Sequence, residues 1–165
     1  MKKLIIINGT SLAGKSTVSE VLLKMLDRAV FLDGDWCWYM HPFQVTPENI
    51  AMVEDNIRHL LQSYLSNSSI EYIVFCWVLH KEFIFNHLLD PLVGNYQLHR
   101  FTLLADPSTI RRRAKIRGGC SETWIDETIA KQENYLSMAG TQIDTSDCNA
   151  EEIASRIYRR LAIKS

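Results

Sequence analysis

Short apolar runs alternate along the chain with longer stretches whose apolar residues recur at helical spacing. The short runs predict β-strands buried on both faces, because they are continuous rather than alternating apolar and polar. We expect such strands at residues 4–8, 30–32, 72–79, 98–105 and 142–144. The regular alternation of strands and helices predicts a parallel sheet with helices on both faces, which is an α/β fold.

The helical stretches carry their own start and stop signals. The first follows Gly14 and places Val18, Leu22 and Met25 on one face. A second begins at Thr46-Pro47, a typical N-cap and first helical residue, and ends near residue 67. Further helices are expected at 82–92, from Asp106-Pro107 to residues 118–119, from a capping box at Thr123-x-x-Asp126 through Leu136, and from Asn149 onward.

Composition places the chain among ordinary globular proteins. It has 165 residues, of which 47% are hydrophobic and 22% charged, and its 18 basic and 19 acidic side chains give a net charge of −1. This composition excludes a disordered or low-complexity chain. It also gives no overall charge that would attract nucleic acid or an anionic membrane. We expect residues 1–165 to form a single domain, since no linker or repeat divides them.

The first apolar run and the cysteines bear on location. The run Leu4–Ile7 stops at Asn8 and is too short for a signal peptide or a membrane span. The four cysteines show no C-x-x-C pair and no zinc-ligand spacing; they are Cys37, Cys76, Cys120 and Cys148. We therefore expect a cytoplasmic protein with reduced thiols.

Residues 9–16 read Gly-Thr-Ser-Leu-Ala-Gly-Lys-Ser and match the phosphate-loop pattern G-x-x-x-x-G-K-[ST] at every fixed position. The loop leaves a predicted strand and enters a predicted helix, so backbone N–H groups would point at bound phosphates. Lys15 would reach the β- and γ-phosphates, and the Ser16 hydroxyl would bind Mg²⁺. A turn that only joins the two elements would not need a lysine followed by a hydroxyl. The residues expected to contact ATP in this segment are Gly9, Thr10, Ser11, Leu12, Ala13, Gly14, Lys15, Ser16 and Thr17.

A second magnesium ligand is expected from an acid outside this loop. In switch GTPases and motor ATPases that acid ends the buried strand beside the first, but residues 72–79 contain no acid, and the chain has no Asn-Lys-x-Asp segment for guanine. Asp33 and Asp35 instead follow the second strand, at the edge where ligands bind in open α/β sheets. We assign magnesium to Asp33 and the acceptor hydroxyl to Asp35, and the reverse assignment stays open.

On these residues the chain resembles the small P-loop kinases of metabolites, a group that includes shikimate kinase, gluconate kinase, chloramphenicol phosphotransferase and the nucleoside monophosphate kinases. The phosphate loop, the Asp33/Asp35 pair, an arginine-rich segment and residues 143–146 (Ile-Asp-Thr-Ser) carry the resemblance. Residues 31–35, followed by His41-Pro42, look most like the gluconate-kinase branch. The resemblance implies a three-layer P-loop NTPase fold, with a parallel sheet of about five strands flanked by helices and a short lid at about residues 111–123.

The lid assignment concerns a strongly basic segment. Residues 100–117 carry six basic side chains against one acid, Asp106, and such a run is either a solvated face or a working surface. Arg113 and Arg117 are four residues apart and therefore share one helical face, and Gly118-Gly119 follows as a flexible joint. The resemblance implies that Arg113 stacks on adenine and that Arg117 reaches the transferring phosphoryl group.

The acceptor side carries weaker signals. Trp36, Arg58 and Trp77 are expected to contact the acceptor together with Asp35, and His41 and His80 are further candidates. The gluconate-kinase branch has charged substrate-binding residues where this chain has aromatic ones: Trp36, Trp38, Tyr39 and Phe43. These aromatic side chains either wall the acceptor pocket or pack a loop onto the core.

Together these features predict an ATP- and Mg²⁺-dependent phosphotransferase that moves the γ-phosphoryl group of ATP to a hydroxyl of a small molecule. Lys15, Asp35 and Arg117 would act in the transfer. A nucleoside monophosphate kinase and a non-catalytic ATP-binding regulatory module are the alternatives. The expected ligands are ATP, Mg²⁺ and the acceptor, without nucleic acid or membrane. The identity of the acceptor, the choice of ATP over GTP and the oligomeric state stay open.

Overall fold

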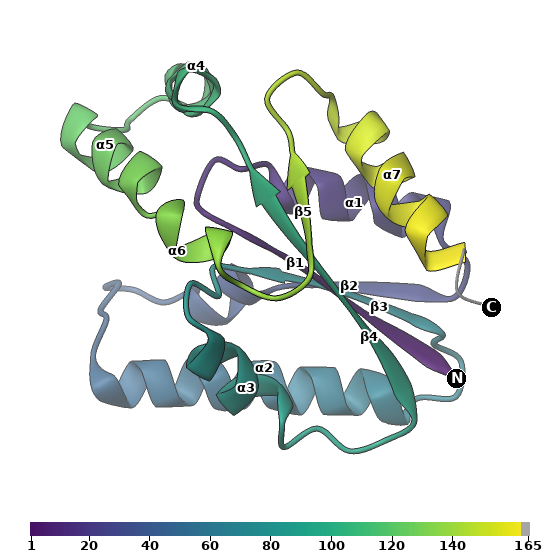
Figure 1. Ribbon diagram of the computed structural model, residues 1–165. Coiled ribbons are helices and arrows are strands. Elements are labelled where there is room, and N and C mark those ends of the chain that lie inside the picture. Colours follow the sequence, from purple (N-terminus) through teal and green to yellow (C-terminus); the bar gives the residue numbers. More distant parts are fainter. Residues whose placement is uncertain (163–165) are drawn as a thin grey trace.

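Five parallel strands form the centre of the molecule in the order β2-β3-β1-β4-β5 (Figure 1). The structure, a computed structural model, describes residues 1–162. The strands are β1 (Lys2–Gly9), β2 (Ala29–Asp33), β3 (Tyr72–Trp77), β4 (Tyr96–Leu104) and β5 (Thr141–Asp144). β1 pairs with β3 on one side and with β4 on the other, so its carboxyl end opens into the middle of one sheet edge. The predicted five-stranded parallel α/β fold is confirmed.

Helices cover both faces of this sheet (Figure 1). α1 (Lys15–Met25) and α7 (Ala150–Ala162) lie on one face, and α2 (Pro47–Ser66) and α3 (Glu82–Leu89) lie on the other. Each face of the sheet has its own hydrophobic core. Alternate residues of β1 pack into these two cores, since Leu4 contacts the core under α2 and Ile5 the core under α1. Beyond the carboxyl ends of the strands lie α4 (Pro107–Arg117), α5 (Glu122–Ala130) and α6 (Glu133–Leu136).

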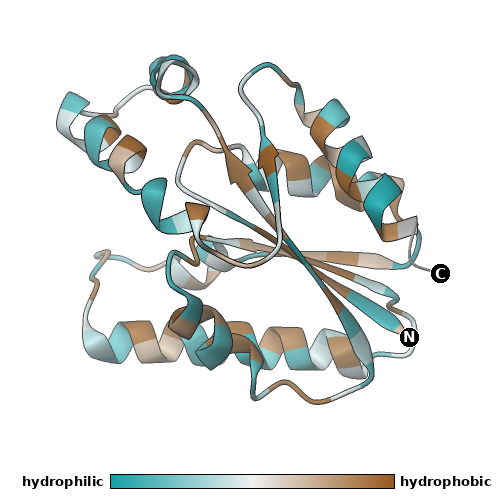
Figure 2. Cartoon of the chain, in the orientation of Figure 1, coloured by the Kyte–Doolittle hydropathy of each residue, from teal (hydrophilic) through white to brown (hydrophobic). Residues whose placement is uncertain are grey.

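The hydropathy pattern explains why the outer helices take these positions. Brown and teal patches alternate along α2 in Figure 2, as expected of a helix that buries one stripe. That stripe is Val53, Ile57, Leu61 and Leu65, all of them buried. No helix among residues 1–162 is both long and apolar enough to cross a membrane.

Three amide side chains hold loops in place, because each forms two hydrogen bonds with the backbone N–H and C=O of a single residue. Asn8 does so with Leu79, at 2.7 and 2.9 Å, and so continues the sheet beyond the end of β3. Gln132 pairs in the same way with Ala105, which follows β4, and Gln62 with Val93. Each amide supplies one donor and one acceptor, so it can replace a strand neighbour where regular pairing has stopped.

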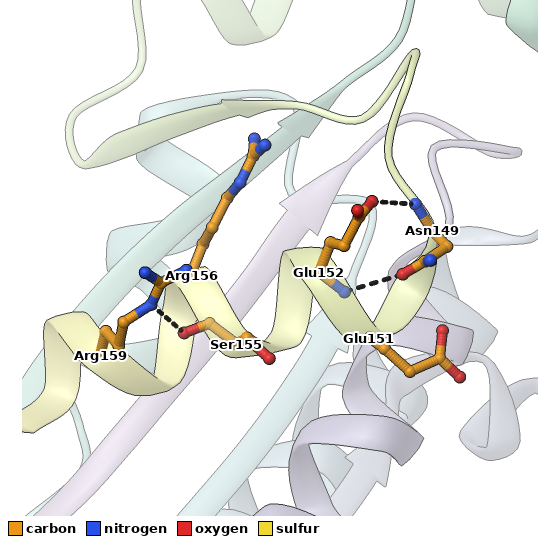
Figure 3. Close-up of a pocket in the computed structure, with 6 residues that line it drawn as sticks. All are labelled: Asn149, Glu151, Glu152, Ser155, Arg156 and Arg159. Carbon is orange, nitrogen blue, oxygen red and sulfur yellow. Dashed lines mark hydrogen bonds between the residues drawn. The ribbon is translucent and has the colours of Figure 1, made fainter.

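Several helix termini follow the predicted signals. Thr46, Asp106 and Asn149 each accept a hydrogen bond from a backbone N–H three residues later. At α7 the arrangement is reciprocal, because Asn149 N–H donates to Glu152 at 2.9 Å while Glu152 N–H donates to the Asn149 side chain at 2.9 Å (Figure 3). This capping box places two acids, Glu151 and Glu152, in the first turn of α7, where the helix dipole favours them.

Other predicted boundaries are wrong. The cap of α5 is Ser121, whose hydroxyl accepts from Trp124 N–H at 3.2 Å, rather than Thr123 two residues later. The helix predicted to run through Leu136 is divided into α5 and α6, because the backbone N–H groups of Gln132 and Asn134 donate to carbonyls three residues earlier instead of four. α3 ends at Leu89 instead of residue 92, because Pro91 has no N–H to extend the ladder.

A short 3₁₀ helix, η1 (Gly34–Trp38), directly follows β2 and was not predicted. Asp33 caps it by accepting a hydrogen bond from Asp35 N–H at 3.0 Å. Gly34 is buried against the indole of Trp77, and a Cβ at this position would lie 2.5 Å from Trp77 Cγ. The absence of a side chain at residue 34 therefore lets β2 and β3 end side by side with their functional residues close together.

Gly34→Ala is expected to destabilise the protein by about 1–3 kcal/mol, because the added methyl overlaps a buried indole and one element must move. Urea unfolding of the single variants and of Gly34→Ala combined with Trp77→Leu measures the effect. The double variant should lose less stability than the sum of the singles, since the smaller side chain makes room for the methyl. Strict additivity would contradict this account of the contact.

Candidate active site

The phosphate loop occupies the carboxyl end of β1, between the ends of β3 and β4. Gly9 has φ 143°, and a Cβ there would lie 2.5 Å from the Leu103 carbonyl oxygen, so only glycine lets the loop pass β4 this closely. Gly14, with φ 95°, begins α1 without any side-chain cap. The first N–H groups of α1 are therefore free for an anion.

Two side chains of the loop, Thr10 and Lys15, are placed to bind phosphate. The hydroxyl of Thr10 is buried and has no hydrogen-bond partner among the described residues. Lys15 folds back, and its ammonium donates to the Thr10 carbonyl at 2.7 Å. Burial lowers the pKa of Lys15, while the carboxylates of Asp35 and Asp33 act in the opposite direction. A triphosphate would supply both the acceptor that Thr10 lacks and the charge that Lys15 needs.

Ser16 and Asp33 form the candidate magnesium site. The Ser16 hydroxyl donates to Asp33 Oδ2 at 2.6 Å, so two hard oxygen ligands meet at the start of α1. Residues 1–162 contain no group of three or more His, Cys, Asp or Glu side chains that could hold a metal. Mg²⁺ fits a two-oxygen site nevertheless, because it keeps water ligands and takes others from nucleotide phosphates. Cys76 lies beneath, 3.9 Å from Ser16, and burial raises its pKa to about 12, so it stays a neutral thiol.

Asp35 lies beside this site but has different partners. The positive charge of Lys15, the indole of Trp77 and the positive charge of Arg117 all act to lower the pKa of its carboxyl. Partial burial of the carboxyl and the negative charge of Asp33 raise the pKa of Asp35 above its usual range, against the effects of those partners. The raised pKa makes Asp35 a more basic carboxylate than an ordinary aspartate, as a general base requires.

Arg113 and Arg117 both lie on α4, but Arg113 is partly buried and Arg117 is exposed. Arg113 donates to the Leu12 carbonyl at 3.0 Å and to the hydroxyl and carbonyl of Thr145 at 3.1 and 3.0 Å. It also lines a pocket of about 460 Å³ between the phosphate loop, α4 and α7, together with Gly14 and Thr17. This pocket lies where a base attached to loop-bound phosphates would fit. Arg117 is exposed, and its guanidinium lies 5.9 Å from the ring of Trp124 on α5.

A separate cavity of about 640 Å³ opens beside Asp35, and we call it the acceptor cavity. Of the predicted acceptor residues, the structure brings Trp77 and Asp35 to it. The rest of its wall comes from η1 and the following loop (Trp38, Tyr39, Phe43 and Val45), from α2 (Ile50 and Glu54) and from the region after β3 (Val78, His80 and Ile84).

Trp36 and Arg58 do not line this cavity. Trp36 packs edge-on against Phe31 at 5.1 Å, on the other side of η1. Arg58 lies on α2 and reaches Asp55 at 3.4 Å. Of the two predicted histidines, His80 reaches the cavity, whereas His41 is not among its lining residues.

Residues 5–134 match the protein family described as AAA domain. The chain belongs to the AAA domain family. Solved structures with the same fold include an unliganded sugar kinase from Janibacter sp. HTCC2649, with TM-score 0.72 and 16% identity over 99% of this chain and 96% of that one. A gluconokinase from Sinorhizobium meliloti 1021 has the same fold with TM-score 0.70 and 18% identity, over 99% of this chain and 97% of that one. No curated protein matches the sequence.

The AAA domain also superposes on the shikimate kinase from Acinetobacter baumannii in complex with shikimate, with TM-score 0.65 and 17% identity over 99% of this chain and 96% of that one. These matches confirm the resemblance to P-loop small-molecule kinases at the level of the fold. Identities this low leave the ligands to be argued from the residues of this chain.

Two other arginines of the basic run, Arg100 and Arg111, form ion pairs that join elements of the fold. Arg100 forms a bidentate ion pair with Glu82, at 2.6 and 2.8 Å, over the ring of Phe85. Arg111 pairs with Glu122 and Asp126 and so joins α4 to α5. The solvated-face interpretation of the basic run therefore suits the exposed side chains of Arg112, Lys115 and Arg117 better than it suits Arg100 or Arg113, which are partly buried.

Two residues that position this site were not predicted. Asn8 holds the segment after β3 through Leu79, and its only signal in the sequence is a polar residue ending an apolar strand. Thr145 is buried and links Arg113 to the Leu104 carbonyl at 3.0 Å. Residues 143–146 carried part of the family resemblance, but no local pattern in the sequence indicated that Thr145 would bind Arg113.

Arg113→Ala is expected to destabilise the AAA domain by about 1–3 kcal/mol and to weaken Mg·ATP binding, because a charged donor to two backbone carbonyls is lost. Lys115→Ala is the matched control, since its side chain is exposed on the same helix and lines neither pocket beside the phosphate loop. Chemical unfolding and titration calorimetry measure both quantities. Equal effects of the two substitutions would contradict a bracing role for Arg113.

Proposed function

We propose that this protein is an ATP- and Mg²⁺-dependent kinase that transfers the γ-phosphoryl group of ATP to a hydroxyl of a small molecule. The observation that carries this proposal is the division of the two acids at one sheet edge. Asp33 is held by the hydroxyl of Ser16, whereas Asp35 faces the acceptor cavity and has a raised pKa. A nucleotide-binding module without transfer would need the first arrangement but not the second.

The transfer step follows from these positions. The oxygen of the acceptor hydroxyl attacks the γ-phosphorus, and Asp35 accepts the proton that this hydroxyl loses. The bond between that phosphorus and the β-bridging oxygen breaks, so ADP leaves with the electron pair and Asp35 later releases the proton to solvent. Lys15 and Arg117 neutralise charge on the transferring group. Bound Mg²⁺, held by Ser16 and Asp33, supplies further charge neutralisation on the phosphate oxygens.

The nucleotide is expected to span two of the cavities. Its phosphates would follow the N–H groups at the start of α1, and its base would enter the pocket lined by Arg113. The joint at Gly118-Gly119, where both residues have positive φ, would let α5 close over the phosphates and exclude water. Closure limits wasteful hydrolysis of ATP.

The alternatives find less support. A nucleoside monophosphate kinase needs cations around its acceptor phosphate, but Arg58 lies outside the acceptor cavity and faces Asp55. A switch GTPase remains disfavoured by the acid-free β3. A cytoplasmic location remains part of the proposal, supported by four cysteines that are all free.

Binding of Mg·ATP is tested first, by thermal melting. The wild-type protein should melt at a higher temperature with Mg·ATP, because a ligand selective for the folded state stabilises it. Lys15→Ala should fold normally yet lose this increase, since its ammonium serves the phosphates. Lys24→Ala, an exposed lysine on the same helix, should keep it. If the wild type shows no increase, the phosphate-loop assignment fails.

Asp35→Asn should lower turnover by roughly a hundred- to ten-thousand-fold with little change in ATP affinity, because a general base acts only in the transition state. In the wild type, kcat/KM should fall on the acid side as Asp35 becomes protonated, at a pH above the ordinary aspartate value of 3.8. Phosphorylation of acceptors by γ-labelled ATP across pH measures both effects. If Asp33→Asn alone abolishes turnover and Asp35→Asn does not, the two roles are reversed.

The same substitution should stabilise the fold at neutral pH. A folded-state pKa raised above the unfolded value means that the ionised carboxyl costs stability above the folded pKa, and that this cost vanishes below the unfolded one. Asparagine removes the cost, so the melting temperature should rise, and the gain should shrink as pH falls. A loss of stability at neutral pH would contradict the raised pKa.

A further inference from the structure

The wall of the acceptor cavity is almost entirely apolar. Four aromatic side chains, Trp38, Tyr39, Phe43 and Trp77, contribute to it, and Trp38 and Phe43 lie with ring centroids 5.7 Å apart. Tyr39 and Phe43 are 100% and 64% exposed, although large apolar side chains at a cavity mouth would gain free energy from being covered. A ligand with an apolar, ring-containing body would cover them.

The charges that face the cavity are negative. Its ionisable lining consists of Asp35, Glu54 and His80, and no lysine or arginine of the described chain lines it. The Glu54 side chain is only 16% exposed, and its ion-pair partner is His87, at 3.5 Å and 59% exposed. An anionic acceptor would bring its charge next to two carboxylates, whereas Lys15 and Arg117, whose charges act on Asp35, are not among the residues that line the cavity.

Cations gather instead in a neighbouring pocket of about 500 Å³, which shares Val78 and His80 with the acceptor cavity. That pocket contains Lys81 and Lys131 and borders Thr10 and Ser11 of the phosphate loop. Positive charge thus lies on the phosphate side of Asp35, and apolar surface with acidic groups lies on the acceptor side.

We infer that the phosphoryl acceptor is an alcohol with an apolar, ring-containing body and no anionic group, which donates a hydrogen bond or presents an amine to Glu54. This inference rests on the proposed kinase activity. It separates the protein from kinases of sugar acids or nucleotides, because those acceptors carry the anionic groups that this cavity disfavours. Asp35, at the cavity wall, would meet the hydroxyl while Glu54 and the aromatic side chains hold the remainder.

Three compounds that share a phenyl ring and a hydroxyl but differ in charge test the inference: 3-phenyl-1-propanol, phenylalaninol and 3-phenyllactate. With γ-labelled ATP, we expect kcat/KM to be at least about tenfold higher for the amino alcohol than for the acid, and the neutral alcohol, which brings no donor to Glu54, to fall between them. Binding of each compound, followed by tryptophan fluorescence, should show the same order. Gluconate, shikimate and AMP serve as anionic comparisons.

Glu54→Gln should bring the preference for phenylalaninol over 3-phenyllactate down by about tenfold, because one of the two facing carboxylates is removed. Glu48→Gln, an exposed acid on the same helix and outside the cavity, should leave the preference unchanged. Both variants should retain the rise in melting temperature with Mg·ATP, which separates an effect on the acceptor from one on the nucleotide.

Two results would overturn the inference while the kinase proposal stands. One is preferred phosphorylation of an anionic acceptor, and the other is a failure of all three phenyl compounds to bind or accept phosphate while Mg·ATP still stabilises the protein. The proposed function fails differently: the phenyl alcohols bind in the expected order, but neither Mg·ATP stabilisation nor transfer to any compound is found.

Discussion

The pairing of β1 with β3 on one side and β4 on the other is the interaction on which the whole site depends. All strands run parallel, so the phosphate loop, the acids after β2 and the indole at the end of β3 emerge at one edge. Register then places Asn8 beside Trp77 and Asp33 beside Cys76. A slip of two residues in one pair would move these groups apart by roughly 7 Å and would separate Lys15 from both acids.

Within that frame, two aspartates two residues apart have different chemistry because they have different neighbours. Asp33 is buried, and its two oxygens accept from Ser16 and from the backbone at the start of η1. Asp35 lies two residues further along, where partial burial and the charge of Asp33 raise its pKa. Gly34 between them is required by the indole of Trp77, which leaves no room for a side chain there. The position beside Asp33 therefore disfavours the ionised form of the base, and the indole of Trp77 and the charges of Lys15 and Arg117 only partly offset this effect on its pKa.

On the proposed function, three cavities at the carboxyl edge of the sheet would take different parts of the ligands. The pocket at Arg113 suits a base, the pocket with Lys81 and Lys131 lies beside the loop and suits phosphate charge, and the aromatic cavity suits an apolar alcohol. The kinases that share this fold act on unrelated acceptors, and here the acceptor side is built by η1, α2 and the segment after β3.

The sequence by itself determined the features whose signals are contiguous in the chain. The phosphate loop, the caps at Thr46, Asp106 and Asn149 and the five apolar strands could each be recognised from a few neighbouring residues. The tertiary structure decided which isolated polar residues, such as Asn8 and Gln132, would hold a distant loop through hydrogen bonds. It also decided which aromatic residues would line the acceptor cavity. Trp36 and Trp38 are two residues apart and look alike in sequence, yet one packs on Phe31 and the other lines the cavity. The choice depends on the side to which a 3₁₀ turn rotates each ring, and that rotation is set by contacts between residues far apart in the chain.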